Sequence, residues 1–129
     1  RTTGGWADLT GSSGLPPYPS VLTAIDAAGG IAGTAMDLAL VGREVATSPD
    51  LAVMLAPRGS VTAEGPYGLG ISRLSVLGRA AVGHGGHLAG ARSVWRCLVG
   101  GPCVAVIANR AEIELEPTAE ALLGIILGR

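Results

Sequence analysis

The chain has 129 residues, 48% of them hydrophobic and only 15% charged, with a formal net charge of −1. This length supports one domain that buries roughly two-thirds of its unfolded surface, and the composition argues against a disordered chain and against a nucleic-acid partner. No apolar run is long enough to span a bilayer, and the sequence does not indicate a compartment.

The first part of the chain contains few regular elements. Residues 1–30 are rich in Gly, Ser, Thr and Pro without a sustained period, so we expect them to be irregular. Thr34 is predicted to cap a helix that ends near residue 46, with the carboxylate of Asp37 in its first turn. The apolar residues that this helix is expected to bury are Met36, Leu40 and Val41.

A second short helix is predicted at Ser48 and Pro49, a capping residue followed by proline at the first helical position. Pro57 should end it, and residues 58–66 should form a loop. The residues that this helix should bury are Leu51, Met54 and Leu55.

From Tyr67 the apolar pattern changes to a period of two, which predicts strands. We expect three of them, near residues 68–76, 80–99 (with a break at the glycines) and 103–109. Pro117 then opens a last helix, whose apolar stripe is formed by Ala119, Leu122, Leu123 and Ile126. The predicted fold class is α+β: an antiparallel sheet of about three strands, a covering C-terminal helix and two short N-terminal helices.

The two cysteines, Cys97 and Cys103, flank a Gly-Gly-Pro turn and could lie on the two arms of a hairpin. We expect them to be reduced and packed, because a disulfide needs a favourable alignment of both side chains.

Residues 83–93 are the segment most suited to chemistry. They hold both histidines of the chain and four of its glycines. Glycines let a backbone approach a ligand closely, and imidazoles titrate near neutral pH. If the protein is an enzyme, we expect its reaction here.

Read with residues 67–70 before it and 106–110 after it, this segment resembles the C-terminal part of a family of serine hydrolases. The family comprises class C β-lactamases, D-alanyl-D-alanine carboxypeptidases (penicillin-binding proteins) and β-lactamase-like esterases. Residues 28–38 are similar to its glycine-rich turn and following helix. The resemblance implies that the whole chain is the C-terminal portion of one such domain, with helices and sheet over residues 31–129.

In this family a serine attacks the carbonyl, a lysine three residues later helps to activate it, and a tyrosine transfers protons. A Lys/His-Thr/Ser-Gly strand closes the site, and the triplet from His84 to Gly86 matches this strand. The resemblance implies a catalytic role for His84, and Gly86 would let the acyl group lie against the strand edge. The backbone N–H of His87 would donate to the oxyanion. Gly85, Arg92 and Asn109 are the further candidates for substrate binding.

The chain departs from this family in one decisive respect. It contains no lysine, so it cannot hold a Ser-x-x-Lys motif. Tyr18, followed by Pro19 and Ser20, resembles the family's Tyr-x-Asn/Ser element but lies too close to the glycine-rich turn, and we interpret it as loop. The nucleophile and its lysine would then come from an N-terminal half of the domain, upstream or on a separate chain. The expected reaction is cleavage of an ester, amide or β-lactam through an acyl-enzyme, with no metal and no cofactor.

Other interpretations stay open. The glycine-rich strand could be a tight packing junction, or the spacing of His84 and His87 could indicate a metal site, although no third ligand is spaced nearby. For Arg92, a salt bridge at a strand edge is favoured over the alternative, contact with a substrate carboxylate. The alternating acidic residues Glu112, Glu114 and Glu116 are most simply a solvated segment. The alternative function is a non-catalytic module of the same fold that binds a peptide, a cell-wall fragment or a partner protein.

Overall fold

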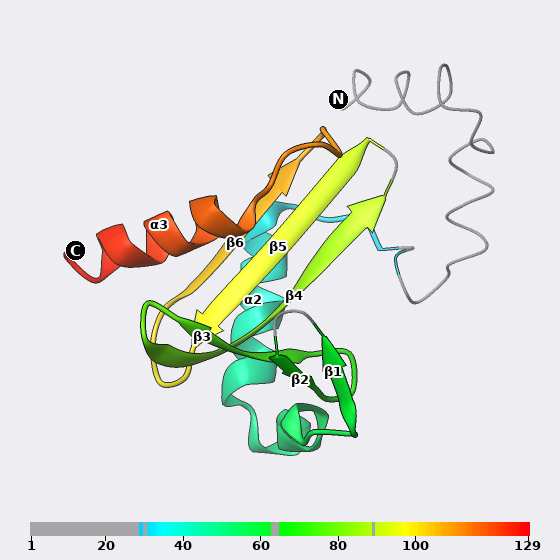
Figure 1. Ribbon diagram of the computed structural model, residues 1–129, viewed down its shortest axis with the longest axis vertical. Coiled ribbons are helices and arrows are strands. Elements are labelled where there is room, and N and C mark those ends of the chain that lie inside the picture. Colours follow the sequence, from blue (N-terminus) through cyan, green and yellow to red (C-terminus); the bar gives the residue numbers. More distant parts are fainter. Residues whose placement is uncertain (1–28, 30, 63–64, 89) are drawn as a thin grey trace.

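The structure, a computed structural model, describes residues 29, 31–62, 65–88 and 90–129. The segment predicted to be irregular, including Tyr18, therefore lies outside the described residues. The helical elements are α2 (Ala35–Thr47), the 3₁₀ helix η3 (Pro49–Leu55) and α3 (Glu116–Ile126). The strands are β1 (Ser60–Thr62), β2 (Gly65–Tyr67), β3 (Ser72–Val76), β4 (Arg79–Leu88), β5 (Ala91–Leu98) and β6 (Cys103–Ala108). They form one antiparallel sheet in chain order, so the α+β class is confirmed (Figure 1).

The predicted number of strands was wrong, because the described sheet has six. β1 and β2 arise within residues 58–66 and at Tyr67, where we expected mostly loop, and three-residue strands are too short to show a period of two. The expected break within residues 80–99 is present, but it is short and includes only the last of the glycines, Gly90. β4 runs through Gly85 without interruption, and the chain reverses only after Leu88, which pairs with Ala91.

The two faces of the sheet carry separate cores, which β5 divides by alternation. Val94 and Leu98 belong to the cluster that α3 completes with Ala119 and Leu123. Trp95, like Cys97, belongs to the cluster that α2 and η3 complete with other apolar side chains. The two α-helices therefore cover opposite faces of the sheet.

The predicted start of α2 is confirmed. The Thr34 hydroxyl accepts a hydrogen bond from the Asp37 N–H at 3.2 Å, and the Asp37 carboxylate accepts one from the Thr34 N–H at 2.8 Å. The Thr34 N–H and, to a smaller extent, the Thr34 hydroxyl, which donates to the same carboxylate at 2.8 Å, lower the pKa of Asp37. The predicted buried side of this helix was wrong. Met36, Leu40 and Val41 are exposed, while Gly42 and Val45 are buried, because the helix meets the sheet at Gly42 against the ring of Trp95.

The second helix begins at Pro49 as predicted and ends at Leu55, before Pro57. Ser48 is the N-cap residue, as predicted, although its side chain makes no capping hydrogen bond. The apolar residues expected to be buried are partly buried against the α2-side core: Leu51, Met54 and Leu55.

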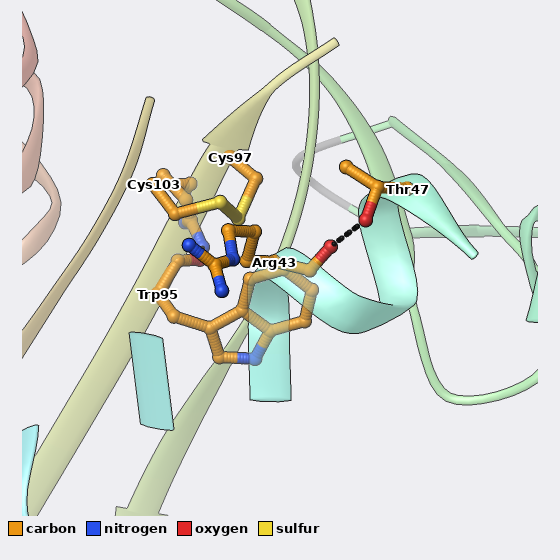
Figure 2. The surroundings of a disulfide bond; sticks show 6 residues. Arg43, Thr47, Trp95, Cys97 and Cys103 are labelled. Atoms are coloured by element: carbon orange, nitrogen blue, oxygen red, sulfur yellow. Dashed lines mark hydrogen bonds between the residues drawn. A yellow bond between two sulfur atoms is a disulfide. The ribbon is translucent and has the colours of Figure 1, made fainter. Parts of the chain in front are cut away.

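The two cysteines form a disulfide, so the expectation of reduced thiols was wrong (Figure 2). Cys97 and Cys103 stand directly opposite each other in β5 and β6, with their Cα atoms 4.0 Å apart. The bond lies beside Trp95 and the Arg43 side chain of α2 (Figure 2). The two Cβ atoms meet because the register of β5 and β6 pairs Cys97 with Cys103. The spacing of the cysteines along the chain does not reveal that register.

The last helix, α3, has Pro117 in its first turn as predicted, and it buries Ala119 and Leu123. Two other members of the predicted stripe are not buried, because Leu122 is 38% exposed and Ile126 is 57% exposed. Among the residues that the structure describes, every helix is too short or too polar to traverse a bilayer.

Candidate functional site

His84 forms the shortest side-chain contact of the candidate site, and its partner is Tyr67. The Tyr67 hydroxyl lies 2.7 Å from Nε2 of His84, and the two rings are tilted with centroids 5.8 Å apart. The pair is half-buried. Residues 67–70 contributed to the family resemblance, but no sequence pattern joined this tyrosine to a histidine 17 residues away.

Tyr67 is held from several sides. Its strand, β2, pairs with Ser60 of β1 on one side and with Ser72 of β3 on the other. Its carbonyl accepts a hydrogen bond from the Arg58 N–H at 3.0 Å. The next residue must be glycine, because a Cβ atom on Gly68 would collide with the Met54 carbonyl of η3. The phenol is therefore presented from a fixed backbone.

The strand that carries His84 has one open side. β3 pairs with β4 only as far as Ser72 opposite Gly83, whereas β5 pairs with β4 as far as Leu88. Figure 1 shows β4 extending past the end of β3. Among the described residues, no strand pairs with residues 84–88 on the β3 side. Unpaired strand backbone of this kind can pair with another extended chain or donate to a ligand oxygen.

The two glycines next to His84 leave this backbone uncovered, and both are exposed. A Cβ atom on Gly86 would lie 2.6 Å from the Ser93 hydroxyl, so a side chain there would push against β5. At Gly85 a Cβ atom would meet only ordinary contacts, the nearest at 3.7 Å from the Ser93 carbonyl oxygen. Gly86 is thus constrained by its neighbour, whereas Gly85 is not.

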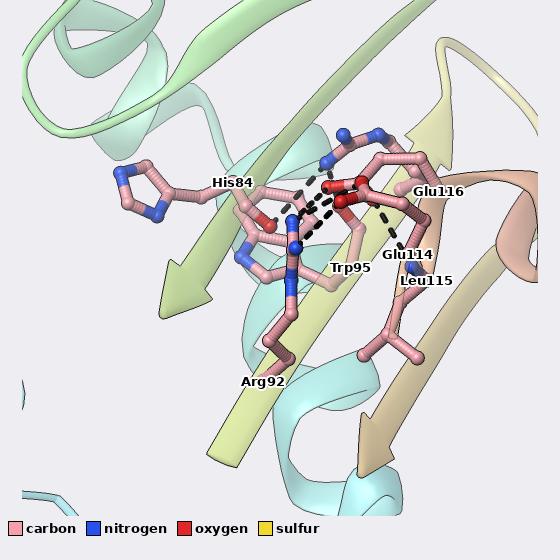
Figure 3. Close-up of polar contacts among 7 residues, drawn as sticks. His84, Arg92, Trp95, Glu114, Leu115 and Glu116 are labelled. Carbon is pink, nitrogen blue, oxygen red and sulfur yellow. Dashed lines mark hydrogen bonds and ion pairs between the residues drawn. The ribbon is translucent and has the colours of Figure 1, made fainter. Parts of the chain in front are cut away.

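The two histidines do not converge. Residues three apart on a strand face opposite sides of the sheet. His84 stands opposite Trp95 on the α2 side, and the exposed His87 stands opposite Arg92 on the other side. Figure 3 shows the imidazole of His84 pointing away from Arg92 and Glu114. This arrangement gives no support to a metal site shared by the pair, and no group of three potential metal ligands occurs in the described part of the chain.

Arg92 is occupied by two carboxylates. Its guanidinium donates two hydrogen bonds to the Glu114 carboxylate, at 2.8 and 3.3 Å, in a bidentate contact. It also lies 3.6 Å from the Glu116 carboxylate (Figure 3). Arg92 therefore forms the predicted salt bridge. The prediction of a solvated segment is confirmed for Glu112 and Glu114, which are exposed although they also face Arg110 and Arg92. It was wrong for Glu116, which is partly buried.

The Glu116 carboxylate carries a shifted pKa. Burial, the largest single influence, raises it. Hydrogen bonds from its own N–H and that of Leu115, with the positive charges of Arg92 and Arg96, outweigh burial and lower the pKa below its usual value. Glu116 is therefore an anion that stabilises the surrounding arginines at neutral pH.

Arg96 is a site residue that the sequence analysis missed. It is 3% exposed, and its guanidinium donates to the carbonyl oxygens of Trp95 at 3.0 Å and His84 at 3.3 Å. It thus places a buried positive charge beside the backbone of His84. The available signal was an arginine between Trp95 and Cys97 in a predicted strand, since an arginine is rarely buried without partners.

Asn109 is not brought to His84. It is exposed and follows Ala108, which pairs with Arg92, whereas His84 lies in the row of Trp95 and Ala105. About 3.3 Å per residue along a strand separates these rows by roughly 10 Å.

Comparisons with models of known families, with curated proteins and with solved structures find no match to this chain. The resemblance to β-lactamase-like hydrolases therefore stays a prediction. The local geometry combines one half-buried imidazole bonded to a phenol, an open stretch of strand backbone directly after it, and a buried arginine behind that backbone. Such an arrangement can hold an extended acyl or peptide group and move a proton next to it.

Proposed function

We propose that this chain is the C-terminal portion of a serine hydrolase domain that cleaves a neutral ester or amide through an acyl-enzyme. The observation that carries the proposal is the position of His84, which stands at the first residue of the open stretch of β4. An acyl group laid along residues 84–88 would place its carbonyl beside backbone N–H donors, and His84 would lie next to it.

The chemistry divides between this chain and the rest of the domain. His84 would exchange a proton or a hydrogen bond with the reacting oxygens, which typically contributes about 10²- to 10⁴-fold in rate. The N–H of His87 would be one donor to the oxyanion, and such a donor is worth about 2.7–4 kcal/mol of barrier. The serine and lysine would come from the N-terminal half, because this chain has no lysine.

The charges of the site support a neutral substrate. Arg92, the nearest arginine on the surface of β5, is paired with Glu114 and Glu116 and is therefore not available to a substrate carboxylate. Gly85 has no hydroxyl to donate to one either. Esters and amides without a charge next to the scissile bond would meet no such mismatch.

The test uses the longer polypeptide in which this chain follows a Ser-x-x-Lys segment, or a co-purifying second chain that supplies it. We expect hydrolysis of a short-chain aryl ester and labelling of a serine by a fluorophosphonate. His84→Ala should lower kcat by about 10²- to 10⁴-fold with an unchanged melting temperature.

His87→Ala is the matched control, because the role proposed for His87 belongs to its backbone. We expect it to change kcat by less than about tenfold, or 1.4 kcal/mol of barrier. Equal losses from both variants together with lower melting temperatures would favour the packing junction. Ester hydrolysis by residues 1–129 alone, abolished by substituting a serine within them, would show that the nucleophile was misplaced.

The second candidate is a non-catalytic module that binds a peptide or a cell-wall fragment. The open side of β4 supports it equally, since an extended peptide can add a strand there without any chemistry. Peptide binding by a polypeptide that is not labelled at serine would favour this candidate over the hydrolase.

A further inference from the structure

The hydrogen bond between Tyr67 and His84 has a consequence for the state of the imidazole. A neutral imidazole carries one N–H and one acceptor nitrogen, and a phenol can donate or accept. The contact to Tyr67 uses Nε2. The identity of the donor in this bond therefore decides which ring nitrogen carries the proton.

Two features favour the phenol as donor. The separation of 2.7 Å is among the most common for O–H donors and lies at the short limit for N–H donors, which are most often found at about 2.9–3.0 Å. A phenol is also a far stronger acid than the N–H of a neutral imidazole, and the imidazole nitrogen is the stronger base. Nε2 then accepts, and the ring proton is on Nδ1.

We propose that Tyr67 is a positioning residue that fixes the neutral ring of His84 as its Nδ1–H tautomer. Nδ1 makes no hydrogen bond within the described part of the chain, so it is the nitrogen left to donate to a ligand oxygen. The firm placement of Tyr67 by β1, β3 and the Arg58 N–H makes this choice a property of the fold. Its value for catalysis rests on the proposed function, but the tautomer itself does not.

The experiment is ¹⁵N NMR of residues 1–129 at a pH at which imidazoles are neutral. The chemical shifts of the two ring nitrogens report which of them is protonated. The chain has only two histidines, so His87→Gln assigns the signals, and the exposed His87 ring is the internal reference. We expect His84 to show Nδ1–H over Nε2–H in an excess of about tenfold.

Tyr67→Phe removes only the hydroxyl and should convert His84 to a mixture of both tautomers. The matched control is Tyr18→Phe, which removes the chain's other tyrosine hydroxyl and should leave His84 unchanged. A wild-type His84 protonated at Nε2, or the same tautomer in Tyr67→Phe, would overturn the proposal. The wild-type spectrum decides the matter alone if the variant fails to fold. The NMR experiment involves no substrate. The proposed tautomer can therefore be wrong while the proposed hydrolase function is right, or right while that function is wrong.

Discussion

Glu116 illustrates how single residues tie the C-terminal helix to the sheet. Its carboxylate accepts a hydrogen bond from the Leu115 N–H at 3.1 Å and faces Arg92 at 3.6 Å, at the very start of α3. Carboxylates in the first turn of a helix also interact favourably with its dipole. Glu116 therefore balances the charge of Arg92 and holds the N-terminal end of α3 against the sheet.

We expect Glu116→Gln to lower the free energy of unfolding by about 0.2–1 kcal/mol at pH 7. The pKa of Glu116 in the folded chain lies below its usual value of 4.5, so folding favours the carboxylate. Its contribution is fully present above about pH 4.5 and is lost as the pH falls through the folded pKa. The difference from wild type should therefore shrink between pH 7 and pH 3.5 in urea unfolding.

Glu112→Gln is the control for this pH dependence. Its carboxylate lies 3.9 Å from Arg110, and both side chains are mostly exposed. We expect its effect to stay within about 0.5 kcal/mol at both pH values. A deficit of Glu116→Gln that is as large at pH 3.5 as at pH 7 would contradict the ionic role of Glu116.

At the level of elements, α2 packs closely on the sheet at Gly42. A Cβ atom on Gly42 would lie 2.5 Å from Cε3 of Trp95 and 2.9 Å from its Cδ2. Trp95 is itself buried between α2 and the neighbouring strands, so its ring has little room to move. The absence of a side chain at this position is what allows the helix to lie on β5.

Gly42→Ala should destabilise the protein even though alanine is the better helix former. The gain in helix propensity is about 1 kcal/mol, whereas forcing extra atoms into a packed core costs about 1–3 kcal/mol. We expect a net loss of up to about 2 kcal/mol, measured as a lower denaturation midpoint with an unchanged slope.

Gly124→Ala in α3 is the matched substitution. Its Cβ atom would meet only Leu77 at 3.9 Å, so we expect a gain of up to about 1 kcal/mol. Equal stabilisation by both alanines would mean that α2 does not rest on Trp95 through Gly42.

The same elements show how far the sequence reaches. Local signals predicted the cap at Thr34 and the prolines that begin η3 and α3, because each acts within one turn of the chain. The sequence also identified the glycine-rich segment of β4. It could not supply the partners, since Tyr67 lies 17 residues from His84 and Arg92 lies 22 residues from Glu114. Such pairs depend on strand register, and a three-residue strand such as β2 is too short for its sequence pattern to indicate the register.

For the molecule as a whole, the outer side of α3 is unusual. The only charged residues of this helix are Glu116 and Glu120, and Ile125 is 70% exposed. A helix that is apolar on most sides is normally covered on most sides. Apolar side chains are also exposed on α2, where Met36 is 69% exposed. In the proposed hydrolase, the remainder of the domain would cover the outer side of α3.

Ile125→Lys tests this cover by comparing two contexts. In residues 1–129 the position is exposed, so the substitution should change the free energy of unfolding by less than about 0.5 kcal/mol and reduce self-association in sedimentation experiments. In the longer polypeptide it should cost about 2 kcal/mol or more, because an unpaired charge would be buried. Val99→Lys, at a 56% exposed turn residue, is the control. It should leave the free energy of unfolding nearly unchanged in both contexts. If Ile125→Lys is equally silent in the longer polypeptide, the remainder of the domain does not cover α3.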